Sequence, residues 1–414
     1  MGSWNRRDFI VKPAGFIAAS RLFGGSRYLL GEAGTAPAVP QAVLPQRTLG
    51  KTGIKMPVLS LGIAAVTTPG LLLRGYELGV RHFDTAGMYQ QGKNEPMLGD
   101  AIKQMGAGAR EKVIISTKLE RPGGFGPPSM QKSYSLAETK AHYDQALASS
   151  LKSLQTDYVD ILLAHSLDSE QEITSEGMLQ SFTEQKKAGR VRAIGFSTHK
   201  AELALKAAVK LGVYDVVLLT FNHTVADDQG LLKAIDEAAA SGIGILAMKI
   251  MAGGTGQLMP GWYNTNPPAN ASARLKWVLN NKSITAAVVG CYSYDHLEQN
   301  IAVASNLKYT SEEEKYLSDK TAAAAAQFCR NCGQCLGDCP RGVAIPELMR
   351  THMYKFQYGD HQLAEQTLAS IERDKGLDAC IECTSCSAAC RHSVNIPWKI
   401  GDLKQGLPGG RLKA

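Results

Sequence analysis

Short apolar runs rich in β-branched residues alternate with longer stretches of helical periodicity between residues 46 and 320. Helical periodicity is clear at Leu136–Leu154, Leu179–Ala188 and Gln229–Ser241. Buried strands that alternate with helices in this way predict an α/β fold with a parallel sheet. Eight runs are predicted to be strands: Val58–Ala65, Val80–Asp84, Val113–Lys118, Tyr158–His165, Ala193–Ser197, Val216–Phe221, Ile243–Met248 and Ala286–Gly290. Eight strand–helix units in about 270 residues correspond to a closed (β/α)8 TIM barrel.

The alternative α/β architecture is a doubly wound sheet that binds a dinucleotide. Its fingerprint, G-x-G-x-x-G at the start of a helix, follows none of the eight predicted strands. The run Gly50-Lys51-Thr52 imitates the end of a phosphate-binding P-loop, but Pro45 stands where that motif begins with glycine. The barrel is therefore the preferred prediction, and the doubly wound sheet is the runner-up.

Polar or small residues stand at the ends of seven predicted strands. They are Asp84, Lys118, His165, Ser197, Asn222, Lys249 and Gly290. The chemistry of a (β/α)8 barrel takes place at the carboxyl ends of its strands. Because a buried core would not supply so many polar groups, these positions predict the rim of an active site.

The last fifth of the chain contains a duplicated cysteine pattern, C-x2-C-x2-C-x3-C. The first copy ends in Cys-Pro, and the second copy begins 51 residues after the first copy begins. The eight cysteines are Cys329, Cys332, Cys335, Cys339, Cys380, Cys383, Cys386 and Cys390. The duplication extends beyond the thiols, because Val343, Ile345 and Pro346 recur at the same offset as Val394, Ile396 and Pro397. This spacing is typical of bacterial ferredoxins that hold two [4Fe–4S] clusters.

In paired motifs of this kind the fourth cysteine of each run ligates the other cluster. One predicted ligand set is Cys329, Cys332, Cys335 and Cys390, and the other is Cys380, Cys383, Cys386 and Cys339. The alternatives are zinc and disulfides. Zinc sites pair C-x2-C units at longer separations, and disulfide frameworks are typical of short secreted chains, so both fit this pattern less well.

Several motifs of the predicted barrel resemble those of the aldo-keto reductase family. They are Gly79-Val80-Arg81-His82-Phe83-Asp84-Thr85-Ala86 with Tyr89, the opening Arg47-Thr48-Leu49-Gly50-Lys51-Thr52-Gly53, and Asn94-Glu95 through Leu98-Gly99. The resemblance covers residues 46–310. With its cysteine-rich end, the chain resembles the bacterial branch of the family that carries a C-terminal iron–sulfur domain.

The resemblance implies a catalytic tetrad of Asp84, Tyr89, Lys118 and His165. Reduction of a carbonyl by hydride needs a proton donor, and the pKa of free tyrosine is about 10. A nearby Lys118 ammonium is expected to lower the pKa of Tyr89, Asp84 to position Lys118, and His165 to polarise the carbonyl. Each residue alone has a structural interpretation as a cap, loop aromatic, strand-end charge or core histidine, whereas the four together favour catalysis.

The resemblance also implies a nicotinamide nucleotide, either NADP(H) or NAD(H). The positions that match the family's nucleotide contacts are Ser197, Thr198, Met248, Lys249, Gly290, Gln299 and Asn300. Leu218 and Met248 replace a glutamine and an aromatic residue that are common there. His296 is the only cationic candidate for a 2′-phosphate between residues 290 and 296, so NADP(H) is expected from the family rather than from these residues.

Composition limits the partners of the protein. A chain of 414 residues with 44% hydrophobic residues can form two or three domains. The formal charge of +7 falls when two clusters bind, because eight thiolates add about −8 and two oxidised cores about +4. Five basic residues also lie in the N-terminal leader: Arg6, Arg7, Lys12, Arg21 and Arg27. A nucleic-acid partner is therefore not expected, and neither is a membrane span, since no run of 18 apolar residues occurs.

The N-terminal leader, residues 1–45, resembles a twin-arginine export signal. Its motif is Asn5-Arg6-Arg7-Asp8-Phe9-Ile10-Val11-Lys12, and Ala36-Pro37-Ala38 resembles a cleavage site. The twin-arginine route exports folded proteins, which suits a protein that acquires clusters in the cytoplasm. The prediction is therefore a periplasmic or envelope protein. An uncleaved leader that acts as an anchor is one alternative, and a cytoplasmic protein, if the leader is not used, is another. A disordered basic tail is the structural alternative.

The predicted domains are therefore the leader at 1–45, the barrel at 46–320 and a helical, ferredoxin-like two-cluster domain at 321–414. A capping box at Thr310 and Glu313 predicts a helix start there. The segment Pro346–Lys375 is predicted to be helical, and a frayed end is predicted from Gly401 onward. The sequence does not specify which face of the barrel the second domain covers.

Two functions of different class follow. The first is an oxidoreductase that transfers hydride between nicotinamide and a small carbonyl or alcohol, with clusters that are structural or serve an external redox partner protein. The second is an iron–sulfur electron-transfer protein whose barrel is a non-catalytic docking scaffold. The complete tetrad favours the first function.

Overall fold

The structure is a computed structural model that describes residues 43–126, 132–252, 269–319, 327–380, 383 and 385–406. The predicted export signal and its cleavage site lie outside these residues. Among the described residues, no helix combines the length and the apolar character needed to cross a bilayer.

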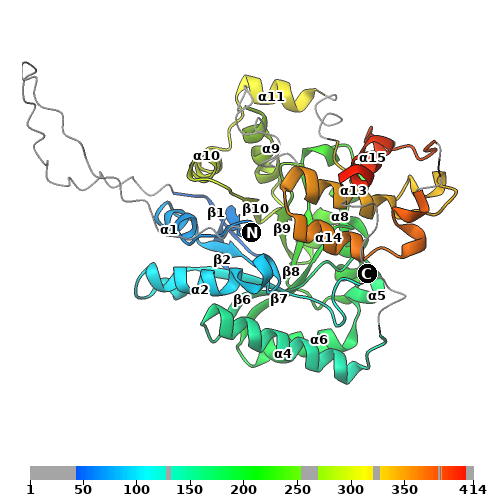
Figure 1. Ribbon diagram of the computed structural model, residues 1–414. Coiled ribbons are helices and arrows are strands. Elements are labelled where there is room, and N and C mark those ends of the chain that lie inside the picture. The colour runs from blue at the N-terminus through cyan, green and yellow to red at the C-terminus, as the bar shows by residue number, and fades with distance from the viewer. Residues whose placement is uncertain are drawn as a thin grey trace, which may run out of the picture. The chain divides into compact units, whose positions relative to one another are not determined.

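Eight parallel strands close into a barrel in the order β10-β3-β4-β5-β6-β7-β8-β9 (Figure 1). Their bounds are β3 Leu59–Gly62, β4 His82–Asp84, β5 Ile114–Leu119, β6 Val159–Ala164, β7 Val191–Thr198, β8 Val216–Thr220, β9 Gly244–Met248 and β10 Ala286–Gly290. Each strand overlaps one of the eight predicted runs. The predicted (β/α)8 barrel is confirmed, and the doubly wound alternative is wrong.

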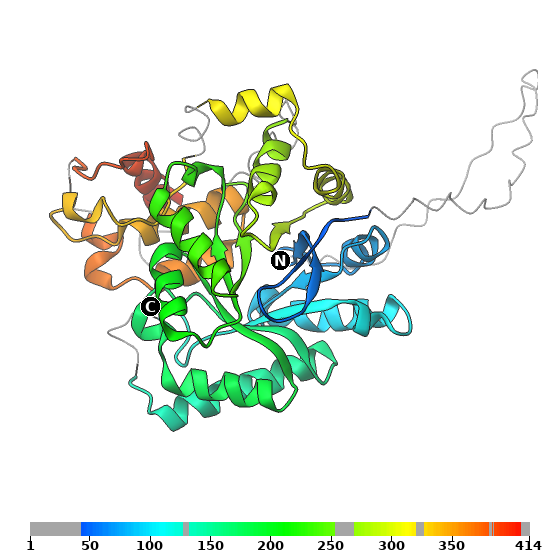
Figure 2. The same ribbon diagram turned by 180° about the vertical axis from the view of Figure 1, so that it is seen from behind.

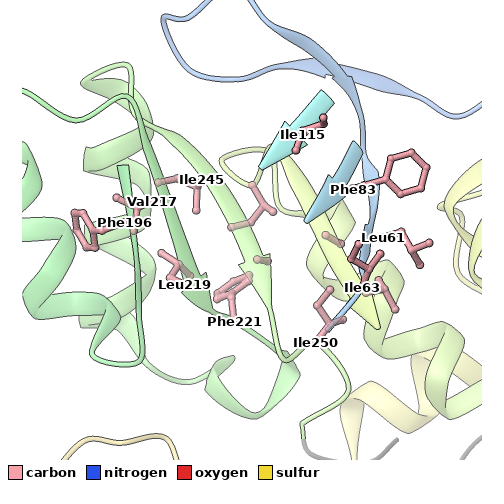
Figure 3. Close-up of a cluster of buried hydrophobic side chains, with 14 of the residues drawn as sticks. Leu61, Ile63, Phe83, Ile115, Phe196, Val217, Leu219, Phe221, Ile245 and Ile250 are labelled. Carbon is pink, nitrogen blue, oxygen red and sulfur yellow. The ribbon is translucent and has the colours of Figure 1, made fainter. Parts of the chain in front are cut away.

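Side chains alternate between the inside and the outside of the barrel wall. On β8, Val216 and Leu218 belong to the apolar cluster in the barrel interior, whereas Val217 and Leu219 belong to the larger cluster between strands and helices. This period of two is the pattern of a strand that is buried on both faces. Figure 3 shows part of the larger cluster, to which Phe83 and Phe196, at opposite sides of the view, both belong.

A two-stranded antiparallel hairpin, β1 Gln46–Thr48 and β2 Lys55–Pro57, precedes the barrel. Leu49, Ile54 and Met56 from the hairpin pack into the interior cluster. At its turn, Gly50 has a φ of 47°, and a Cβ there would lie 2.3 Å from the carbonyl oxygen of Gly242, just before β9 begins. The hairpin therefore closes the amino-terminal end of the barrel and leaves the opposite end for chemistry.

Helices cover the outside of the barrel (Figures 1 and 2). Their bounds are α1 Gly70–Glu77, α2 Asn94–Gln104, α3 Ala109–Lys112, α4 Leu136–Leu154, α5 Glu170–Ile173, α6 Glu176–Lys187, α7 Ala201–Leu211, α8 Gln229–Ala240, α9 Ala269–Asn280, α10 Tyr294–Ser305 and α11 Ser311–Ser318, with short 3-10 turns η1 Tyr89–Gly92 and η3 His223–Val225. The predicted capping box of α11 is confirmed, since Thr310 and Glu313 bond reciprocally.

Residues 327–406 form a small helical unit, here called the cluster module. Its elements are η4 Leu336–Asp338, α13 Ile345–His352, the π-helix η5 Met353–Tyr358, α14 His361–Ala369, η6 Arg373–Lys375, η7 Asp378–Cys380 and α15 Ile396–Gly406. The V-x-I-P repeat of the sequence is structural: α13 and α15 begin at its two isoleucines, and the valine and isoleucine of both copies are buried in one core. The predicted helical segment is confirmed, but the frayed end predicted from Gly401 is wrong as far as Gly406, because α15 continues there.

Candidate functional site

A pocket opens at the carboxyl ends of the barrel strands. From the barrel, its wall contains Asp84, Tyr89 and Lys118 together with the small residues Gly62, Ala64 and Ala65. The cluster module supplies the facing wall, which consists of Tyr354, Tyr358, Asp360 and Leu363. Figures 1 and 2 both place the orange helix α14 beside the green segments of the barrel. The module therefore covers the face of the barrel where the sequence places the chemistry.

Lys118 and Asp84 form a buried ion pair at the base of the pocket. They lie on neighbouring strands β5 and β4, and the Lys118 Nζ is 2.5 Å from the Asp84 Oδ2. Ser116 donates to the other carboxylate oxygen at 2.6 Å, and Lys118 also donates to the Thr85 carbonyl at 2.8 Å. Burial alone would lower the pKa of Lys118, but the adjacent Asp84 and Tyr89 outweigh burial and raise the pKa. Lys118 is therefore a fixed cation at neutral pH.

Tyr89 begins η1, directly above this ion pair. The Lys118 Nζ lies 4.9 Å from the centroid of the Tyr89 ring. Burial raises the pKa of Tyr89 above its ordinary value, and the Lys118 charge opposes that rise without reversing it. The contribution expected of Lys118 is present, but the expected net lowering of this pKa is not. Tyr89 is therefore a protonated phenol at neutral pH and can donate a proton.

His165 follows β6 and meets Tyr89 edge to face, with ring centroids 5.9 Å apart. Burial lowers the pKa of His165 well below its usual range, and the Lys118 charge adds to this, so the imidazole is neutral at pH 7. Within the described part of the chain its Nδ1 is buried and has no hydrogen-bond partner. A buried polar atom without a partner beside a pocket is suited to contact a ligand.

Three of the residues predicted to contact a nucleotide line the same pocket, namely Met248, Lys249 and Gly290. A Cβ added at Gly290 would meet no atom within 4 Å, so the pocket reaches the backbone there. Small residues on one side of the pocket leave room for a flat ring, and the lysine ammonium on the other side complements the charge of an anionic chain. These residues fit a nicotinamide nucleotide.

The other four predicted nucleotide contacts are placed differently. The Ser197 hydroxyl accepts from the Ser166 amide at 2.9 Å, and Thr198 donates to Asp168 at 3.1 Å. Asn300 is buried and donates to the Cys291 sulfur at 3.4 Å, whereas Gln299 is exposed on α10. In this structure the first three side chains form hydrogen bonds within the protein, and their contact with a nucleotide stays a prediction.

Electrostatic interactions link the eight predicted cluster ligands in two sets that each join both cysteine runs. Cys329 lies within electrostatic range of Cys332, Cys335 and Cys390. Cys380 lies within range of Cys383, Cys386 and Cys339. Ser387 in the second run also donates to the carbonyl of Asp338 in the first at 2.7 Å. These interactions are compatible with the predicted exchange of the fourth cysteine between the runs, and the ligand sets stay a prediction.

The surroundings of these thiols suit an iron–sulfur cluster. As free thiols they would be protonated, because burial raises the pKa of Cys329 to about 12 and that of Cys335 to about 11. Lys399 is buried within electrostatic range of Cys329, and Lys404 donates to the carbonyl of Cys380 at 2.8 Å. Each group therefore has a cation that offsets the negative charge of a thiolate-bound cluster. Among the described residues, no three His, Cys, Asp or Glu side chains are grouped so that they could hold a single metal ion.

Sequence reasoning missed the polar residues that join the barrel to the module. Asp168 and His199 follow β6 and β7 and contact Arg350 and Tyr354 of the module. His199 stands two residues after the predicted strand end Ser197, so reading further into that loop could have found it. The module residues have no local signal, because nothing in their own segment shows that they face the barrel.

Comparison with known sequence families matches both parts of the chain. The profile of the aldo/keto reductase family matches residues 66–274, and that of a 4Fe-4S dicluster domain matches residues 328–395. An L-galactose dehydrogenase from Arabidopsis thaliana is 26% identical over 310 residues, which are 67% of this chain and 93% of the relative. An L-glyceraldehyde 3-phosphate reductase from Escherichia coli K12 is 24% identical over 326 residues, which are 64% of this chain and 89% of the relative.

Solved structures are similar over the barrel. A presumed aldo-keto reductase from Pseudomonas aeruginosa is 26% identical with a TM-score of 0.50, and the similarity covers 63% of this chain and 94% of that protein. The holo form of an aldo-keto reductase from Bacillus halodurans is 21% identical with a TM-score of 0.52 over 66% of this chain and 95% of that one. At this identity the second similarity supports the fold alone.

Proposed function

Because the chain belongs to the aldo/keto reductase family and carries a 4Fe-4S domain, we propose that it is a nicotinamide-dependent oxidoreductase that interconverts a carbonyl and an alcohol. This proposal rests on the buried ion pair of Lys118 and Asp84, whose Nζ–Oδ2 distance is 2.5 Å, and on the position of Tyr89 next to it and of His165 next to Tyr89. An ion pair so deeply buried costs desolvation free energy, which a purely structural role explains poorly. It holds a proton donor in place for chemistry.

The tetrad residues have distinct roles in this proposal. Bound nicotinamide supplies hydride to the carbonyl carbon in reduction and accepts it from the alcohol in oxidation. Tyr89 donates a proton to the carbonyl oxygen, and Lys118 stabilises the phenolate that remains. Asp84 holds Lys118 in position, and the neutral His165 orients the carbonyl oxygen.

The nucleotide is proposed to be NADP(H), with NAD(H) as the alternative. Met248, Lys249 and Gly290 would hold its nicotinamide half, and the exposed Gln299 on α10 its adenosine half. The module wall formed by Tyr354 and its neighbours would slow release of the nucleotide. Slow release would allow a protein exported by the twin-arginine route to keep its nucleotide outside the cytoplasm, where no free supply is expected.

We further propose two [4Fe–4S] clusters in the module, one in each group of four cysteines. Clusters exchange single electrons, whereas nicotinamide exchanges two as hydride. The clusters are therefore assigned to stabilising the module that closes the pocket or to electron exchange with a separate redox protein.

The test is to purify the protein anaerobically from the envelope of its host, denature it and quantify nucleotide per chain. About one bound NADP or NAD per chain is expected, together with reduction of an aldehyde panel that a Tyr89→Phe variant loses by about 10²- to 10⁴-fold. A Tyr89→Phe variant with full turnover would contradict the proposed role of Tyr89. Intact clusters without nucleotide binding or turnover would favour the alternative of an electron-transfer protein with a non-catalytic barrel.

A further inference from the structure

Tyr354 of the cluster module reaches into the barrel site and makes two polar contacts there. Its hydroxyl is 3.0 Å from the Nζ of Lys249, which follows β9, and 3.2 Å from the Nε2 of His199, which follows β7. The Lys249 Nζ also lies 4.7 Å from the centroid of the Tyr354 ring. Tyr354 is 3% exposed and belongs to the π-helix η5, a rare conformation that is frequently found at functional sites. Its placement is therefore fixed by both parts of the chain.

The hydrogen-bond directions around Tyr354 follow from its neighbours. The Asp168 carboxylate lies 3.4 Å from the Nδ1 of His199 and accepts from the His199 amide at 2.7 Å. Within the described part of the chain this Nδ1 has no hydrogen-bond partner, but the charge of the nearby carboxylate favours the tautomer with its proton on that nitrogen, which leaves Nε2 as an acceptor. Tyr354 then donates its proton to His199 and accepts a hydrogen bond from the Lys249 ammonium.

This arrangement leaves hydrogen-bonding capacity that faces the pocket. A phenol oxygen has two lone pairs, and an ammonium has three N–H groups. The Lys249–Tyr354 hydrogen bond uses one lone pair and one N–H group. A ligand hydroxyl could thus donate to Tyr354 and accept from Lys249 at the same time, which neither a methyl group nor a hydrogen atom can do.

The two residues share the pocket with Asp84, Tyr89 and Lys118 of the tetrad. Tyr89, Lys118, Lys249 and Tyr354 all line it. A charge on Tyr354 would raise the pKa of Tyr89, and the charge of Lys249 lowers that of His165, so both residues lie within electrostatic range of the tetrad. A ligand in this pocket is therefore in the same space as both Tyr89 and Tyr354.

We propose that Tyr354 and Lys249 form a hydroxyl-recognition subsite shared by the cluster module and the barrel, and that the substrate is a hydroxylated carbonyl compound or the corresponding polyol. The proposal rests on the proposed function of the tetrad. It makes the module part of the substrate site, so that binding depends on the module being in place. Losing a hydrogen-bonding partner in such a site costs much of the discrimination between a hydroxylated ligand and its deoxy analogue.

The experiment compares two three-carbon aldehydes, glyceraldehyde and propanal, on the full-length protein with its clusters. The wild type is expected to prefer glyceraldehyde in kcat/KM by about 10-fold or more, and Tyr354→Phe to lower that value for glyceraldehyde by about 10- to 100-fold, chiefly through KM. Propanal should change by less than about 3-fold. Tyr358→Phe, which removes a hydroxyl from the same helix and the same pocket, is the matched control and should keep the preference. Lys249→Met is a second variant, read by the ratio of kcat/KM for glyceraldehyde to that for propanal, because loss of Lys249 should also weaken nucleotide binding and lower both values; the ratio should fall as in Tyr354→Phe.

Binding of the polyol xylitol, measured by calorimetry, gives a readout that needs no turnover. The wild type and Tyr89→Phe should bind xylitol, and Tyr354→Phe should bind it at least about 10-fold more weakly, with cluster absorbance and melting temperature confirming that each variant is folded. If no protein turns over but this binding difference holds, the proposed function fails and the subsite stands. If both aldehydes change by the same factor in Tyr354→Phe, or the wild type does not bind xylitol, the subsite is overturned.

Discussion

The guanidinium of Arg350, on α13 of the cluster module, lies 3.2 Å from the carboxylate of Asp168, in the loop that follows β6 of the barrel. Burial by itself would raise the pKa of Asp168, but His199 and then Arg350 outweigh burial and hold the pKa far below its usual range. The carboxylate is therefore charged at all ordinary pH values and ties the module to the loop that carries His165.

This ion pair predicts that Asp168→Asn destabilises the docked module by about 2–3 kcal/mol, because Arg350 is then left buried without an opposite charge. Asp227→Asn is the matched control: Asp227 also pairs with a module arginine, Arg330 at 2.7 Å, but its side chain is 73% exposed, so a loss below about 1 kcal/mol is expected. Thermal unfolding of the two holoproteins measures the difference. Equal losses would show that the buried pair has no special role in docking.

The elevated pKa of Tyr89 predicts the pH dependence of carbonyl reduction. Reduction needs the protonated phenol, and burial places the pKa above its ordinary value, so kcat/KM should stay level from about pH 7 to 9 and fall only above about pH 10. Alcohol oxidation needs the phenolate, so its rate should rise above about pH 10, where the rate of reduction falls. The check is a pair of pH profiles measured in the two directions. A fall in reduction below pH 9 would contradict the protonated state assigned here to Tyr89.

The thiol grouping predicts how paired cysteine substitutions affect iron content. Cys329→Ser combined with Cys390→Ser removes two ligands from one predicted cluster and should leave about four of eight irons per chain. Cys329→Ser combined with Cys339→Ser removes one ligand from each cluster and should lower iron further and weaken both electron paramagnetic resonance signals. Iron analysis of the anaerobic proteins distinguishes the two. The opposite ranking would indicate that each cluster uses four cysteines of a single run.

Substitution of glycine by alanine is expected to have different effects at two strand glycines, Gly195 and Gly290. A Cβ at Gly195 would lie 1.9 Å from the carbonyl oxygen of Val216 on the neighbouring strand, so Gly195→Ala should separate β7 from β8 and cost about 3 kcal/mol. Gly290 has no atom within 4 Å of such a Cβ. Gly290→Ala should keep the melting temperature and weaken nucleotide binding, since the methyl group would project into the proposed nucleotide site. A stable Gly195→Ala protein would contradict the close strand contact.

The barrel and the cysteine groups could be predicted because their signals are local or repeated. Val216 to Leu219 alternate between two cores, and that alternation is already present in the sequence as a strand pattern. The cysteine runs and their V-x-I-P extensions are two copies of one segment, so each copy supports the interpretation of the other. Asp84, Lys118 and His165 could be predicted to lie together because parallel strands bring their carboxyl ends to one edge, whereas Tyr89 lies in a loop and is predicted from the family resemblance alone.

The direction of the Tyr89 pKa could not be predicted from residue types. The sequence indicates that a lysine is near, but the balance between its charge and burial depends on how much water reaches the phenol. The module wall of Tyr354, Tyr358, Asp360 and Leu363 is part of what limits that access.

The sequence by itself determined the strands and the barrel, because periodicity and strand order are properties of the chain, and its motifs and their spacing predict the tetrad and the ligand sets. Only the tertiary structure decided that the cluster module covers the end of the barrel where the predicted tetrad lies. That decision depends on a few contacts between residues far apart in the sequence, such as Arg350 with Asp168 and Tyr354 with Lys249. Within its own segment of the sequence, nothing distinguishes either partner from an ordinary surface residue. The two partners interact only when both segments are folded and water is excluded between them.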